Sequence, residues 1–271
     1  MIFSIFNIYK KCNIFLHLLH IFDKNLKILA LFFHKNVLLF VLNFASVKYM
    51  MKKIPLRVDF AGGWLDVPAY ARAGGFIVNC AIKPFVSIKN WPYRIGGGLG
   101  GSAGWSILTG KDAYRFDAMN GCGWQDPAII LETGLCVWKS DKKPELHYKN
   151  TGHMLRGKMA IYDTQIPHDN KKVAQKKRDY IKIYEASRVA AHAIESKNYT
   201  ELARAVNLTY LAQLDEGMSK LPPINGAIAY KYCGGGHGGY ALYMFRSKIE
   251  RDFVIKGNPR FHAIEPYCKR K

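Results

Sequence analysis

The chain has 271 residues, of which 49% are hydrophobic and 22% charged, an ordinary globular composition with enough length for one large domain or two small ones. Six cysteines are scattered without a Cys-x-x-Cys pair, which argues against a zinc site and a disulfide scaffold and favours a cytoplasmic location. The net charge of +20 favours anionic partners such as nucleotides, sugar phosphates or nucleic acid.

Residues 1–50 differ in composition from the rest of the chain. They consist mainly of Phe, Ile, Leu, Asn and Lys, and they contain no Gly, Pro, Glu or Arg. Their apolar runs are interrupted by His and Lys before reaching the roughly 18 residues of a membrane helix, so we expect no stable membrane span. We expect the working chain to start at Met50 or Met51 and residues 1–50 to be a spurious or disordered extension. The alternative is an amphipathic membrane anchor.

Regular patterns of secondary structure begin at Ile54. "IPLRVDFAGG" alternates like a strand and ends on a Gly-Gly turn. Residues 74–90 predict two strands that join near Pro84, and residues 102–110 predict a short helix. "AIILETGLCVWK" and "KMAIYDTQ" are too short for periodicity to separate helix from strand.

The second half is more helical. Residues 171–197 predict a helix with one apolar face, and residues 199–218 predict another. Residues 227–245 predict a strand, a glycine turn and a strand, and residues 260–268 predict a closing strand. Strands followed by helices and a final hairpin predict an α+β fold with two lobes.

One stretch, "YRIGGGLGGSAG" at residues 93–104, gathers five glycines around Leu99 before Ser102. Glycines without a Cβ let successive backbone N–H groups form a nest for an anion, and a helix starting at Ser102 would add its positive end. The run lacks the lysine of the G-x-x-x-x-G-K-[ST] loop, and it fits the dinucleotide pattern only weakly. The alternative is a tight turn between strands.

Three segments together resemble the motifs of the GHMP kinase superfamily, which includes galactokinase, homoserine kinase, mevalonate kinase and phosphomevalonate kinase. They are "PLRVDFAGGWLDVPAYARAGGFIVNCAI" (55–82), "GGGLGGSAG" (96–104) and "CGGGHGGYALYMF" (233–245), in the superfamily's order. The first is most similar to the sugar-kinase branch, the heptose 7-phosphate kinases and the kinase part of fucokinases. The resemblance implies a shortened two-lobed α+β fold. An S5-like ATP-binding domain would span residues 51–165, and a ferredoxin-like domain would span residues 166–271.

The resemblance also implies a site. ATP would be held by the glycine loop and the residues after it: Gly96, Gly97, Gly98, Leu99, Gly100, Gly101, Ser102 and Ala103. Ser102 would contact Mg²⁺. Within "GCGWQDP" (121–127), Asp126 would be the catalytic carboxylate, with Arg57 as its partner. The sugar or sugar phosphate would be bound by Asp66 with Gly62, Gly63 and Trp64.

These roles suit the chemistry, because phosphoryl transfer depends on positioning and charge neutralisation. Asp126 would take the proton of the acceptor hydroxyl, and Arg57 would stabilise that carboxylate and the transferring charge. Each residue also has a structural alternative. Arg57 could be a surface cation on a strand, Asp66 could cap a turn, and Asp126 before Pro127 could cap a helix.

The sequence departs from the superfamily in its short intervals at residues 82–96 and 102–126, and no acidic magnesium partner stands out beyond the candidates Asp112 and Asp117. We predict an ATP-dependent kinase acting on a sugar or sugar phosphate. The first alternative is a catalytically weak kinase-fold protein that binds a sugar phosphate or nucleotide. A nucleic-acid binder is the second, supported by "KKVAQKKRDYIK" (171–182), although such a run is usually a solvated helix face. We therefore expect no nucleic-acid partner. The sequence leaves the identity of the sugar and the oligomeric state open.

Overall fold

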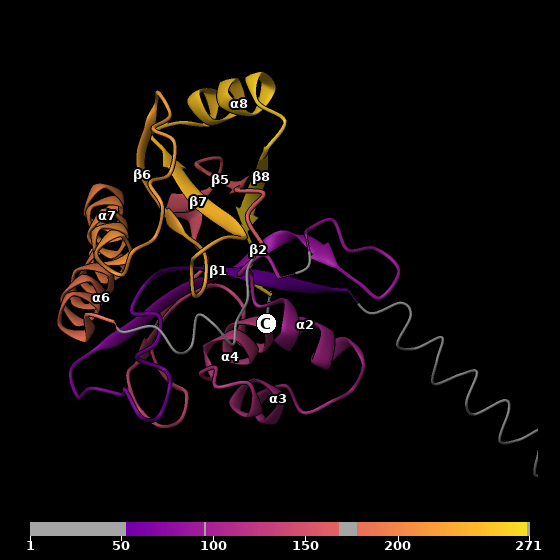
Figure 1. Ribbon diagram of the computed structural model, residues 1–271, viewed down its shortest axis with the longest axis vertical. Helices are drawn as coiled ribbons and strands as arrows, with labels where there is room; N and C mark the ends of the chain where they lie inside the picture. Colours follow the sequence, from indigo (N-terminus) through magenta and orange to yellow (C-terminus); the bar gives the residue numbers. More distant parts are fainter. Residues whose placement is uncertain (1–52, 95, 168–177, 270–271) are drawn as a thin grey trace, which may run out of the picture. The chain divides into compact units, whose positions relative to one another are not determined.

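The computed structural model describes residues 53–94, 96–167 and 178–269 (Figure 1). Lys52–Lys271 form one compact unit. The expected extension at residues 1–50, and most of the basic run at residues 171–182, lie outside the described residues. Within the described part of the chain, no helix combines the length and the apolar character that crossing a membrane requires.

The described residues contain eight strands and six α-helices. The strands are β1 (Ile54–Ala61), β2 (Phe76–Val86), β3 (Leu135–Lys139), β4 (Glu145–Asn150), β5 (Met159–Asp163), β6 (Ala227–Tyr232), β7 (Tyr240–Phe245) and β8 (Phe261–Pro266). The helices are α2 (Gly101–Leu108), α3 (Ala113–Met119), α4 (Gln125–Glu132), α6 (Tyr180–Glu195), α7 (Tyr199–Asp215) and α8 (Lys248–Gly257), with a short 3₁₀ helix at His153–Leu155.

All the strands belong to one antiparallel sheet. Its order is β4-β3-β2-β8-β5-β7-β6, and β1 pairs with β2 outside this path. The two halves of the sheet meet only where β2 pairs with β8, at Ile82 with Pro266 and Lys83 with Glu265. Strands from the first half of the chain thus continue into strands from the second half. β5 lies before the expected boundary at residue 165, but it pairs with β7 and β8.

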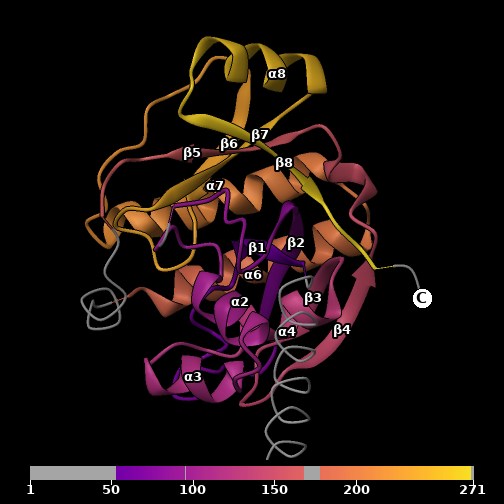
Figure 2. The same cartoon turned by 90° about the vertical axis from the view of Figure 1, so that its right-hand side faces the viewer.

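The helices cover both faces of this sheet (Figures 1 and 2). Side chains alternate along β7, so that Leu242 and Met244 enter the central core with residues of α6 and α7, while Tyr243 and Phe245 pack on the other face. Val254 of α8 covers that second face. α2 and α4 pack against β1, the first strand.

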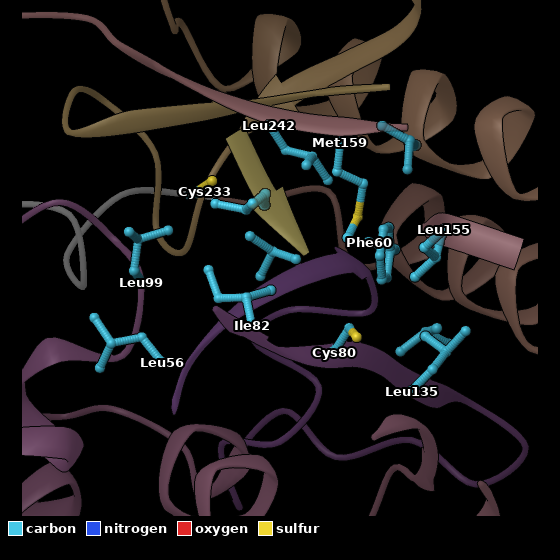
Figure 3. Packing of buried hydrophobic residues seen from close by; sticks show 14 of the residues in the cluster. Leu56, Phe60, Cys80, Ile82, Leu99, Leu135, Leu155, Met159, Cys233 and Leu242 are labelled. Carbon is cyan, nitrogen blue, oxygen red and sulfur yellow. The ribbon is translucent and has the colours of Figure 1, made fainter. Parts of the chain in front are cut away.

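The central core joins the two halves of the sheet (Figure 3). Leu56 and Phe60 of β1 belong to the same buried cluster as Met159 of β5 and Leu242 of β7. Leu99, from the glycine run, is also buried in this cluster. The glycine run is therefore anchored to the core by its one large side chain.

Most expected elements are confirmed, with two kinds of correction. Residues 76–86 form the single strand β2 and not two strands, with Pro84 inside it. α3, β4 and α8 were not predicted. α3 and β4 are short and bury few of their side chains. For α8 a usable signal was present, since Ser247 and Glu250 form a capping box, the Ser-x-x-Glu pattern that marks a helix start.

Candidate active site

A cavity of about 480 Å³ lies between β1, the glycine run and the first turns of α2 and α4. It brings together predicted residues from four separate segments: Arg57, Gly63, Trp64, Asp66, Gly96–Ser102 and Asp126. Two predicted residues do not line it. Gly62 has its backbone against Phe76 of β2, and Ala103 is fully buried in the core.

The glycine run adopts backbone angles that favour glycine. Gly98 and Gly100 both have φ of 76°, in the left-handed region. A Cβ on Gly98 would lie 2.5 Å from the carbonyl oxygen of Cys233, and the N–H of Tyr240 donates to the carbonyl of Gly97 at 2.9 Å. The run at 96–101 therefore lies directly against the glycine turn between β6 and β7, the third predicted motif.

The run leads into the N-terminus of α2. The helix starts at Gly101, one residue before the predicted start, and no side chain caps it. The first N–H groups of an α-helix have no partner within the helix, and they carry the positive end of its dipole. Because Gly100, Gly101 and Ser102 line the cavity, this helix end is suited to a phosphate group.

Arg57 and Asp126 form an ion pair at the cavity wall. Arg57 Nε donates to Asp126 Oδ1 at 2.6 Å, and Arg57 is only 3% exposed. Burial alone would lower the pKa of Arg57, but the charges of Asp126 and Asp59 raise it. The alternative of a surface cation is therefore wrong. Asp126 lies in the first turn of α4, whose N-cap is Trp124, so it is not the helix cap either.

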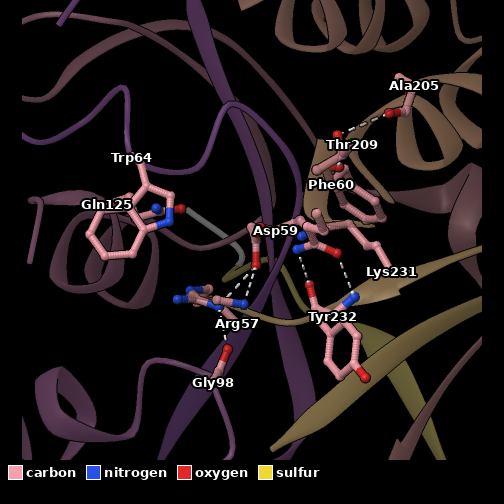
Figure 4. A network of polar contacts seen from close by, with 12 residues as sticks. Arg57, Asp59, Phe60, Trp64, Gly98, Gln125, Ala205, Thr209, Lys231 and Tyr232 are labelled. Carbon is pink, nitrogen blue, oxygen red and sulfur yellow. Dashed lines mark hydrogen bonds and ion pairs between the residues drawn. The ribbon is translucent and has the colours of Figure 1, made fainter. Parts of the chain in front are cut away.

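Sequence reasoning missed two buried charges beside this pair (Figure 4). Asp59 Oδ1 accepts from Arg57 Nη1 at 3.2 Å, and Asp59 Oδ2 accepts from Lys231 Nζ. Asp59 and Lys231 are 2% and 0% exposed. The strand period of two places Arg57 and Asp59 on the same face of β1, and that signal was available in "RVD".

Asp66 is present at the site, but its oxygens are already bonded. They accept from the N–H of Trp64 at 3.1 Å, the N–H of Gln125 at 3.0 Å and Gln125 Nε2 at 3.1 Å. Burial raises the pKa of Asp66 to about 6, and the nearby charge of Asp126 also raises it. Asp66 therefore holds the loop after β1 to the start of α4, next to Asp126. Its contact with a substrate stays a prediction.

Ser102 and Asp117 could hold a cation. Ser102 Oγ donates to Asp117 Oδ1 at 2.9 Å, and among the described residues the buried Asp117 Oδ2 has no hydrogen-bond partner. Burial and the charge of Asp126 raise the pKa of Asp117 to about 7. A hydroxyl and a carboxylate oxygen suit Mg²⁺, which is usually bound by one or two carboxylates together with substrate phosphates. The other candidate, Asp112, caps α3 by accepting from the N–H of Arg115.

Aromatic side chains that sequence reasoning did not single out form another wall. Trp91 comes from the short interval after β2, and Trp105 comes from α2. Their ring centres lie 6.1 Å apart at an angle of 64°, and Trp105 is 47% exposed. An exposed indole face beside an anion site can stack on a nucleobase.

No protein-family model matches the sequence, and no curated protein matches it. Solved structures match the fold. Mevalonate kinase from L. major, in complex with R-mevalonate, has 13% identity and a TM-score of 0.60 over 82% of this chain and 97% of that one. Galactokinase from Lactococcus lactis, complexed with galactose, has 12% identity and a TM-score of 0.54 over 84% and 98%. D-glycero-D-manno-heptose 1-phosphate kinase from Bacteroides thetaiotaomicron has 15% identity and a TM-score of 0.54 over 80% and 96%.

The likeness confirms the expected fold. Mevalonate kinase and galactokinase are both members of the superfamily that the sequence motifs resemble, and the matches span almost the full length of those chains. The chain therefore has the two-lobed α+β fold of GHMP kinases. At identities between 12% and 15%, the likeness shows the fold and leaves substrate and residue roles to be argued from the site.

Proposed function

We propose that the protein is an ATP-dependent small-molecule kinase of the GHMP type, which transfers the γ-phosphoryl group of ATP to a hydroxyl of a sugar or sugar phosphate. The observation that carries this proposal is the ion pair between Arg57 and Asp126, 2.6 Å long, in the same cavity as the glycine run and the N-terminus of α2. A carboxylate, a buried cation and an anion site are the parts that phosphoryl transfer to a hydroxyl requires.

The nucleotide would lie along the glycine run. Its β- and γ-phosphates would accept from the N–H groups of residues 96–102, and its base would stack on the exposed face of Trp105 near Trp91. Ser102 and Asp117 would hold Mg²⁺, which when bound neutralises charge on the phosphates. Gly100 of the glycine run lies beside Asp126, since a Cβ on Gly100 would be 3.4 Å from the Asp126 carboxylate. A γ-phosphate bound at this end of the run would therefore face Asp126.

In the transfer step a bond forms between the acceptor oxygen and the γ-phosphorus, and the bond from that phosphorus to the β–γ bridging oxygen breaks. The hydroxyl proton passes to Asp126, and ADP leaves with the bridging oxygen. Arg57 keeps Asp126 oriented, and its positive charge favours the negative charge that develops between acceptor and phosphate. The acceptor would lie beside Gly63 and Trp64, which line the cavity next to Asp126.

The proposal is tested by incubating the protein with ATP and Mg²⁺ and a panel of sugars, sugar phosphates and mevalonate. Mass spectrometry then identifies any acceptor that has gained a phosphoryl group. We expect at least one sugar or sugar phosphate to be converted only when ATP and Mg²⁺ are both present. Binding of ATP and an acceptor without any conversion would instead support the kinase-fold binding protein. Stable binding of RNA that weakens with salt would support the nucleic-acid binder. A cytoplasmic location stays a prediction from the cysteine pattern.

A further inference from the structure

The buried charges beside the catalytic pair come from both halves of the chain. Arg57 and Asp59 lie on β1, and Lys231 lies on β6 at the far edge of the sheet order. Lys231 Nζ contacts Asp59 twice, at the carboxylate and at the backbone carbonyl oxygen, where the distance is 2.9 Å. The N–H of Gly234, in the turn after β6, also donates to Asp59 Oδ1 at 2.9 Å.

These contacts fix Asp59, and Asp59 in turn contacts Arg57. The guanidinium of Arg57 is held at two of its nitrogens. Nε donates to Asp126, while Nη1 donates to Asp59 Oδ1 at 3.2 Å and to the carbonyl of Gly98 at 2.6 Å. A guanidinium is planar, with donors in a fixed fork. The direction of Nε therefore depends on where Nη1 is held, and one of its two acceptors is the carboxylate that Lys231 fixes.

The charges of the cluster balance. Two cations, Arg57 and Lys231, face two carboxylates, Asp59 and Asp126. Three of the four side chains are almost fully buried, and that of Asp126 is 16% exposed. Burial alone would raise the pKa of Asp59, but the charges of Lys231 and Arg57 hold it below its usual value. Removing one charge from such a buried group leaves another charge buried and uncompensated, which is strongly destabilising.

We propose that Asp59 and Lys231 are positioning residues, which hold the guanidinium of Arg57 so that its Nε faces Asp126. The C-terminal half of the chain thereby sets the geometry of a catalytic pair located in the N-terminal half. This inference rests on the proposed function for its kinetic consequence, but the position of Arg57 can be tested without any turnover.

Three variants separate positioning from a merely structural role. Asp59→Asn and Lys231→Met each remove one charge, and the double variant Asp59→Asn/Lys231→Met restores the charge balance. We expect each single variant to lower kcat by about 10²-fold, the order of effect of a misplaced catalytic group, with little change in the KM for ATP. In the double variant, thermal stability should recover towards wild type while kcat stays low. Recovery of kcat together with stability would overturn the proposal, because the pair would then serve only to support the fold.

The second measurement does not depend on activity. Crystal structures of Asp59→Asn and of the double variant should show Arg57 Nε moved away from Asp126 Oδ1. An unchanged contact in either folded variant would overturn the proposal, whether or not an acceptor is ever found. If the wild-type protein phosphorylates no acceptor, the proposed function fails, and the position of Arg57 alone decides this inference. If Asp59→Asn does not fold, the charge-balanced double variant provides the same test.

The matched control is Asp215→Asn. Asp215 also accepts from a lysine, Lys182 Nζ at 2.6 Å, but its side chain is 57% exposed at the end of α7. The same chemical change at this exposed pair should leave kcat and the position of Arg57 unchanged. A comparable loss of kcat in the control would show that the effect of Asp59→Asn is not specific to the buried cluster.

Discussion

At the scale of single residues, Gly100 is a position in the cavity wall where both the backbone and the neighbouring side chains favour glycine. Its φ of 76° lies in the left-handed region, and an added Cβ would lie 3.3 Å from the Arg57 side chain and 3.4 Å from the Asp126 carboxylate. The Arg57 side chain would have to move by a few tenths of an ångström, while the Asp126 carboxylate would be at van der Waals contact. A side chain here would therefore strain the backbone and also displace Arg57, a member of the proposed catalytic pair.

We expect Gly100→Ala to weaken ATP binding at least tenfold in addition to destabilising the fold. The matched control is Gly217→Ala, because Gly217 has φ of 84° and no atom near its added Cβ. Each change should cost about 1–2 kcal/mol of stability through left-handed backbone strain, but only the first should alter nucleotide affinity. Isothermal titration with a non-hydrolysable ATP analogue measures the difference. Equal affinities in the two variants would show that the glycine run is only a turn.

Asp66 makes stability depend on pH. Its pKa is raised to about 6 by burial, above the ordinary value, so the folded state binds this proton more tightly than the unfolded state. Ionised Asp66 therefore costs stability above about pH 6, and that cost disappears as pH falls towards 4. The raised pKa corresponds to roughly 3 kcal/mol. Urea unfolding of wild type and Asp66→Asn should show wild type gaining by about that amount, relative to the variant, between pH 7 and pH 4. Parallel pH profiles would contradict the buried position of Asp66.

At the scale of secondary-structure elements, α2 and α3 together supply the proposed cation site. Ser102 lies in the first turn of α2, and Asp117 lies in α3. Asp117→Asn should raise the Mg²⁺ concentration needed for half-maximal turnover at least tenfold, because it removes a charged oxygen ligand. Asp112→Asn is the control, because asparagine caps a helix about as well as aspartate and the change leaves the oxygens of Ser102 and Asp117 in place. If the two variants respond alike to Mg²⁺, Asp117 is not a ligand.

The same helix α2 carries the proposed base platform. Stacking of a base on an aromatic ring contributes about 1–3 kcal/mol, so Trp105→Ala should weaken binding of the ATP analogue by about 5- to 150-fold. Phe253→Ala on α8 removes another aromatic ring that is 79% exposed, and it should leave nucleotide binding unchanged. An unchanged affinity in Trp105→Ala would place the base elsewhere in the cavity.

The elements also show what sequence patterns could and could not predict. The glycine run, Arg57 and Asp126 were predictable, because their chemistry depends on residue type and order along the chain. Asp59 and Lys231 are 172 positions apart, and their strands are not neighbours in the sheet, so their contact depends on the packing of the whole chain. The partner of Ser102 was ambiguous for the same reason, since only the packing of α3 on α2 separates Asp117 from Asp112.

At the scale of the whole molecule, the described residues from position 53 onwards contain a buried core, the eight-stranded sheet and the cavity. We therefore expect a chain starting at Met51 to fold and to bind ATP as the full chain does. Thermal unfolding with and without ATP and Mg²⁺ compares the two lengths, since ligand binding raises the unfolding temperature. Loss of folding on removal of residues 1–50 would contradict the expectation that this stretch is a spurious or disordered extension.

The overall fold was predictable from the order of the motifs. The joining of the strands into one continuous sheet was not. Apolar alternation indicated most strands, yet nothing local indicates that β2 pairs with β8 and so joins the two halves into one sheet. Ile82 of β2 and Ile264 of β8 belong to one buried cluster. Pairings between distant strands depend on the packing of the whole chain, so short sequence patterns leave them undetermined.

The most direct test of the central claim, that Asp126 is the carboxylate on which phosphoryl transfer depends, is the kcat of Asp126→Asn measured with the best acceptor found for the wild-type protein. Asparagine keeps the shape of the side chain but cannot take up the proton. We predict that kcat falls by about 10²–10⁴-fold, the usual contribution of a positioned base, while the KM values for ATP and acceptor change little. A folded Asp126→Asn variant that turns over at the wild-type rate would contradict the account.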